Sequence, residues 1–169
     1  TGNPNANNNF DGANAWHFTN NLQFSASKTL NFETYILYRF AQGAKGAIDL
    51  NNRTNRKEDF TIGSRVTWFL SNKLQFITEA AYQLKHYKDY TANRTRVSED
   101  GTATVTHISF GPMYVPNGSR DMFARPTFRL IYSLGYYNNY AVQERLSDYL
   151  LNIDKDIGHY IGLKTEFWF

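Results

Sequence analysis

The chain closes on GHYIGLKTEFWF, residues 158–169, and this stretch decides the fold because its residues alternate in character. One set of alternate residues is mostly apolar: His159, Ile161, Leu163, Thr165, Phe167 and Phe169. The other set mixes charges with a single tryptophan: Tyr160, Gly162, Lys164, Glu166 and Trp168. A period of two places the two sets on opposite sides of an extended chain. The stretch therefore predicts a β-strand with one apolar and one charged face.

The same alternation recurs in six earlier segments, and a helical period does not compete with it. These predicted strands cover residues 15–25, 30–41, 59–70, 73–87, 104–115 and 123–137. The segment 104–115 is the least regular, and its Pro112 indicates a bulge or local break. No run of apolar residues is long enough for a transmembrane helix. The fold class expected is all-β, with seven antiparallel strands in one segment.

The connections between these strands alternate strictly between short and long. The short ones are SASK, SN and PNGSRD, and the long polar ones cover about 42–58, 88–103 and 138–157. Residues 1–14 have the same polar loop composition. An up-and-down meander with tight turns at one end and long loops at the other gives this pattern. It is typical of outer-membrane barrels, with periplasmic turns and extracellular loops. A soluble lipocalin-like barrel has no physical reason for it.

Alternation alone does not say which face meets water. The polar face carries charges of both signs well inside the strands, and the apolar face is continuously large. Aromatic residues near the strand ends, Trp16, Trp68, Tyr136 and Phe167, match the girdles at the two membrane interfaces. We therefore expect lipid outside and water inside. A soluble β-barrel binding protein, with its charges on the solvent side, stays open as an alternative.

Composition excludes several other classes of protein. The net charge of +3 includes 15 acidic residues, which is too balanced for a nucleic-acid-binding protein. Cysteine is absent, and the four histidines are scattered over separate predicted strands without metal-ligand spacing. No nucleophile motif or glycine-rich phosphate loop occurs. We expect no enzyme activity, no metal and no cofactor.

Two stretches carry more than periodicity. FARPTFRLIYSLGYYNN, residues 123–139, resembles the penultimate strand of the maltoporin-like carbohydrate porins, in which an Ala-Arg-Pro-x-x-Arg segment recurs. GHYIGLKTEFWF resembles the closing strand of that family, and GPMYVPNG, residues 111–118, is also in place. The specific resemblance covers roughly the last third of the chain, whereas residues 1–100 agree only in pattern.

The resemblance implies an eighteen-stranded, trimeric barrel in the bacterial outer membrane that passes sugars and oligosaccharides by passive diffusion. This chain would supply about the last seven strands, and the remaining N-terminal strands would lie before Thr1. The terminal Phe169 would be presented to the barrel-assembly machinery, with Phe167 and Phe169 facing the lipid. The penultimate tryptophan of the family's closing strand lines the channel, and here that position is Trp168.

Sugar recognition in such a channel needs aromatic rings for the apolar sugar faces and charged groups for the hydroxyls. The candidate rings are Trp168, Tyr160, Tyr35 and Phe69. The candidate donors are Arg39, Arg65, Arg125, Arg129 and Lys164, and the candidate acceptors are Glu33, Glu79 and Glu166. Two other interpretations stay open. In the first, Arg125, Arg129 and Glu79 form ion pairs that only stiffen the barrel; in the second, the pore is a general or anion-leaning porin without sugar specificity.

Overall fold

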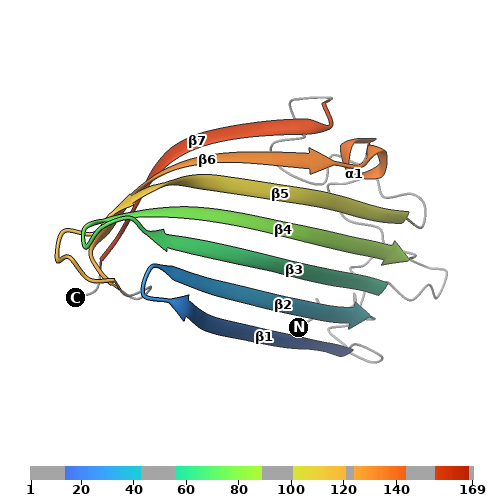
Figure 1. Ribbon diagram of the computed structural model, residues 1–169. Helices are drawn as coiled ribbons and strands as arrows, with labels where there is room; N and C mark the ends of the chain where they lie inside the picture. The colour runs from blue at the N-terminus through green and yellow to red at the C-terminus, as the bar shows by residue number, and fades with distance from the viewer. Residues whose placement is uncertain (1–13, 43–55, 89–100, 121–123, 144–154, 168–169) are drawn as a thin grey trace.

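The computed structural model describes residues 14–42, 56–88, 101–120, 124–143 and 155–167, and shows one antiparallel sheet (Figure 1). Its seven strands lie side by side in chain order. They are β1 (Asn14–Ser27), β2 (Leu30–Gln42), β3 (Arg56–Phe69), β4 (Leu74–Lys88), β5 (Gly101–Tyr114), β6 (Thr127–Tyr137) and β7 (Ile157–Glu166). The sheet has two ends (Figure 1): β1, β3, β5 and β7 end, and β2, β4 and β6 begin, at what we call the turn end. The strand ends that border residues 43–55, 89–100 and 144–154 lie at the opposite end, which we call the loop end.

The predicted meander is confirmed, with differences at the strand ends. β3 begins at Arg56 and β5 at Gly101, so residues 56–58 and 101–103 are strand and not loop as predicted. Asn14, expected in a loop, opens β1. Residues 124–126 precede β6, although the prediction placed them inside it. Pro126 explains that error, because proline has no N–H to donate to a β-ladder.

The two faces of the sheet differ in exposure as well as in chemistry. The large hydrophobic side chains that are exposed within the described strands lie on the apolar face with one exception, Tyr160. Side chains of the charged face are the more deeply buried ones, among them Asp59, Thr67, Gln75 and Arg129. A curved sheet crowds the side chains on its concave side and separates those on its convex side. The charged face is therefore the concave one.

Aromatic rings form two bands on the apolar face. At the loop end, the ring of Trp16 lies 5.1 Å from that of Tyr38 and 5.9 Å from that of Phe40. At the turn end, Trp68 lies 6.2 Å from Phe76, and Phe128 lies 5.8 Å from Phe167 in an edge-on contact. These bands occupy the positions predicted for the girdles, because Trp and Tyr favour the membrane–water interface.

A short helix closes over the loop end of the charged face. Helix α1 (Asn139–Gln143) follows β6 directly, and its Ala141 packs with Ala103 of β5. The amide of Asn138 fixes this contact: its Oδ1 accepts from the backbone N–H groups of Thr104 and Ala141, and its Nδ2 donates to the carbonyl of Thr102. Across the described residues, no helix is long and apolar enough to cross a membrane.

The face assignment predicts costs of different size for neighbouring substitutions on β5. Ile108 lies mid-strand on the apolar face, so Ile108→Lys places a charge in the hydrocarbon and should lower the free energy of unfolding by about 2–4 kcal/mol. Ser109→Lys, one residue along on the charged face, is the matched control and should cost less than about 1 kcal/mol. Denaturant unfolding of the reconstituted protein measures both. Equal costs would contradict the assignment.

Candidate functional site

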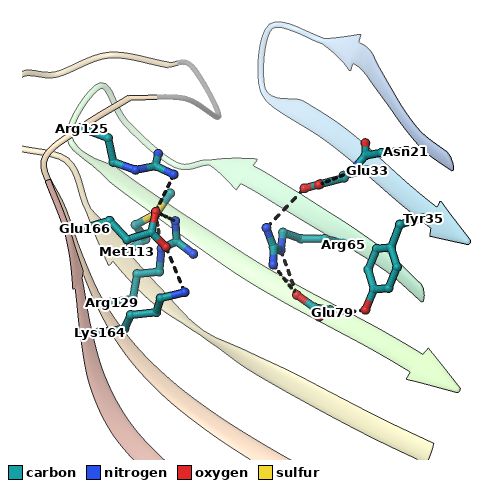
Figure 2. A network of polar contacts seen from close by, with 10 residues as sticks. All are labelled: Asn21, Glu33, Tyr35, Arg65, Glu79, Met113, Arg125, Arg129, Lys164 and Glu166. Atoms are coloured by element: carbon teal, nitrogen blue, oxygen red, sulfur yellow. Dashed lines mark hydrogen bonds and ion pairs between the residues drawn. The ribbon is translucent and has the colours of Figure 1, made fainter. Parts of the chain in front are cut away.

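The first polar group on the charged face, the Arg65 network, consists of Asn21, Glu33, Tyr35, Arg65 and Glu79 (Figure 2). Strand register makes Glu33, Arg65 and Glu79 direct neighbours across β2, β3 and β4. The guanidinium of Arg65 reaches Glu33 at 3.2 Å and Glu79 at 2.7 and 2.9 Å. Cross-strand partners of opposite charge stabilise one another, and here one cation bridges two carboxylates.

Two further side chains complete the Arg65 network. Asn21 of β1 donates from Nδ2 to Glu33 at 2.8 Å. The Tyr35 hydroxyl donates to Glu79 at 3.3 Å, although β3 lies between their strands. Gly63 makes this reach possible: a methyl group there would overlap the Tyr35 ring. The ring therefore lies flat over β3, half-buried, with its hydroxyl engaged.

The second polar group, the Glu166 cluster, lies nearer the turn end, on β6 and β7 and in the residues just before β6. Oε2 of Glu166 lies 2.5 Å from Nη2 of Arg125 and accepts a hydrogen bond of 3.2 Å from Arg129, and its Oε1 lies 3.0 Å from Lys164 Nζ. Arg129 also places its Nε 3.1 Å from the sulfur of Met113 on β5. The side chains of Arg125 and Arg129 are 14% and 10% exposed, whereas that of Lys164 is 56% exposed. Arg125 and Arg129 are thus largely enclosed by the wall, whereas Lys164, on the edge strand β7, stays accessible while it contacts Glu166.

Tyr160 stands apart from both groups. It is 62% exposed and lies on the charged face of β7, opposite Ser133 of β6. Its hydroxyl end covers Gly162, where a methyl group would overlap the ring. The ring therefore lies along β7 and extends toward Lys164. Among the Phe, Tyr and Trp rings of the charged face whose exposure the structure describes, Tyr160 is the exposed one.

The remaining candidates are placed as follows. Arg39 is exposed on the charged face of β2, in register with His17 and Asp59. Phe69 lies on the same face near the turn end, but it is only 5% exposed, so little of its ring is open to a ligand. Trp168 and Phe169 lie outside the described residues.

Sequence reasoning missed four participants. Asn21 and Met113 belong to the polar groups, and Gly63 and Gly162 provide the space for the two tyrosine rings. Glycine inside a strand is unfavourable and often marks a place where another group approaches the backbone closely. The positions of Gly63 and Gly162 were therefore the available signal for the two ring contacts. Asn21 and Met113 gave no signal, because strand register was needed to place them.

A comparison with protein families shows which family the chain belongs to. The model of the LamB porin family matches residues 1–169, the whole chain. The chain belongs to the LamB porin family. Proteins of this family are diffusion porins of the bacterial outer membrane. No curated protein matches the chain at the threshold applied.

Membership in this family makes the protein a channel of the bacterial outer membrane and not a member of an enzyme family. Within the ranges that the structure describes, no group of three His, Cys, Asp or Glu side chains is placed to hold a metal ion. The site residues are thus rings, cations and carboxylates arranged along a wall, which suits transient contact with a passing solute.

The Arg65 network predicts a large effect of removing its single cation. Arg65→Met leaves Glu33 and Glu79 facing each other without a counter-charge, and partial exposure limits the penalty to about 1–3 kcal/mol of unfolding free energy. Arg39→Met, on the same face, should cost less than about 0.5 kcal/mol. Combining Arg65→Met with Glu33→Gln and Glu79→Gln should recover most of the loss. Unfolding in detergent reads all three, and a failure of the triple variant to recover would count against the network.

Proposed function

We propose that this LamB-family porin mediates sugar-selective passive diffusion, with sugars and oligosaccharides as its solutes. Membership in the family carries the proposal, and the pairing of an exposed ring with fixed polar groups on one wall supports it. Tyr160 offers an aromatic face to the apolar side of a sugar ring. The Arg65 network and Lys164 offer acceptors and donors to its hydroxyls.

Transport requires contacts that are weak enough to release the solute. Tyr160 is exposed and Tyr35 is half-buried, so we assign the main stacking surface among the described residues to Tyr160 and a supporting place in the wall to Tyr35. The resemblance of the closing strand adds Trp168 as a second stacking ring. Arg125 and Arg129 are mostly buried and act chiefly by holding Glu166.

The sheet is open, since β1 and β7 each pair on one side only in the described structure. An unpaired strand edge in hydrocarbon leaves backbone groups unsatisfied, at several kcal/mol each. We therefore propose that N-terminal strands outside this chain close the barrel to the eighteen strands of the family. A homotrimer in outer-membrane lipid, and recognition of Phe169 by the barrel-assembly machinery, belong to the same proposal.

The experiment is single-channel conductance of the porin purified from outer membranes and placed in a planar bilayer. Maltooligosaccharides or glucosides added to one side should reduce the ion current by occupying the channel. If no sugar changes the current, the sugar assignment is wrong and a general porin remains.

Aromatic substitutions locate the contact. Tyr160→Ala should weaken the sugar block by about three- to tenfold, because an aromatic contact contributes roughly 0.5–1.5 kcal/mol. Tyr160→Phe keeps the ring and should stay within about twofold. Trp168→Ala should weaken the block in the same way. A Tyr160→Phe variant as impaired as Tyr160→Ala would assign the effect to the hydroxyl and not to the ring.

A further inference from the structure

The four charged side chains of the Glu166 cluster are unbalanced in charge. Three cations, Arg125, Arg129 and Lys164, face the one carboxylate of Glu166, which leaves a formal charge of +2 on the group. The Arg65 network is the reverse, since its one cation faces Glu33 and Glu79. The two groups therefore carry formal charges of opposite sign, and the cationic one lies nearer the turn end.

The cations of the Glu166 cluster differ in exposure. Both arginines are held in the wall, but the Lys164 ammonium is exposed on the charged face. Tyr160 precedes it by four residues on the same face of β7, about 13 Å away along an extended strand. The Tyr160 ring lies over Gly162 and so covers part of that interval. The Tyr160 ring thus lies on the same face as the Lys164 ammonium and extends toward it.

We infer that Lys164, backed by Arg125 and Arg129, binds an oxyanion carried by a sugar, so that the channel's solutes include acidic sugars. The inference rests on the sugar channel proposed above and names its solute class. The sugar ring lies on Tyr160, and its carboxylate or phosphate group accepts hydrogen bonds from the Lys164 ammonium. Charge-assisted hydrogen bonds of this kind are about twice as strong as neutral ones. Glu166 limits the attraction, which keeps the solute releasable.

The test compares fluxes of radiolabelled glucose, glucuronate and glucose 6-phosphate into vesicles containing the purified porin. The readout is the ratio of acidic-sugar to glucose flux, so that changes in pore number cancel. Lys164→Gln should lower the ratio by about three- to tenfold at low salt, and Glu166→Gln should raise it by a similar factor. Lys85→Gln removes the same charge from the same face of β4, outside the cluster, and should leave the ratio within about twofold.

Salt provides a second readout that a structural role would not move. The Debye length falls from about 30 Å at 0.01 M to about 3 Å at 1 M, so the preference for acidic sugars should collapse at high salt while glucose flux does not. If Glu166→Gln raises the flux ratio for glucuronate alone, the ligand is a carboxylate. If it raises the ratio for both glucuronate and glucose 6-phosphate, the site binds oxyanions in general.

Several results would overturn the inference. They are a ratio that does not respond to Lys164→Gln, shifts of the same sign for Lys164→Gln and Glu166→Gln, or an equal shift for Lys85→Gln. Heat-modifiable gel mobility checks that each variant is folded. The sugar-channel proposal fails separately, by the absence of any block by maltooligosaccharides, because the flux ratio is measured without reference to that block.

Discussion

Every feature of this protein depends on the need to pair backbone N–H and C=O groups where no water is available. In hydrocarbon an unpaired group costs several kcal/mol, so the chain must form continuous ladders between neighbouring strands. The ladders fix the register, and the register fixes which side chains share a face. A slip of one residue would turn every charge of a strand toward the lipid. The alternating sequence and the hydrogen-bonded sheet are therefore two aspects of one constraint.

That constraint explains why the polar groups are so well ordered. In a β-sheet, strand register and not loop conformation determines which side chains lie next to one another. Glu33, Arg65 and Glu79 are therefore neighbours on three successive strands. Two glycines then allow tyrosine rings to lie flat along the wall, where larger residues would lift them away. The result is a wall with fixed charges and with tyrosine rings that lie flat against the strands. Such a surface can contact a solute without trapping it.

Much of the fold could be predicted from sequence because period-two patterning is strong over long strands. The strand order, the short and long connections and the two faces follow from it, and the family match agrees. The errors lie at strand ends, where local residue pattern competes with pairing: residues 56–58 look like polar loop but pair with residues 40–42 of β2 and 86–88 of β4. Register across strands is not encoded locally. For that reason Arg65 was a candidate from its sequence, whereas its specific partners were not predictable.

For the individual site residues, too, the face could be predicted from alternation, whereas exposure and partners depend on strand pairing. Tyr160 and Lys164 could be placed on the charged face from alternation, but the exposure of both and the burial of Phe69 depend on neighbouring strands. Similarly, alternation did not show that three cations share Glu166, because Arg125 precedes β6 and reaches the cluster from outside the strand.

In the proposed channel the charged face lines water and the apolar face meets lipid. The chain has no cysteine, so single cysteines can be introduced at successive positions 104–109 of β5 and treated with a membrane-impermeant thiol reagent in the reconstituted porin. We predict fast labelling at positions 105, 107 and 109 and protection at 104, 106 and 108. Uniform labelling, or the opposite alternation, would contradict the account.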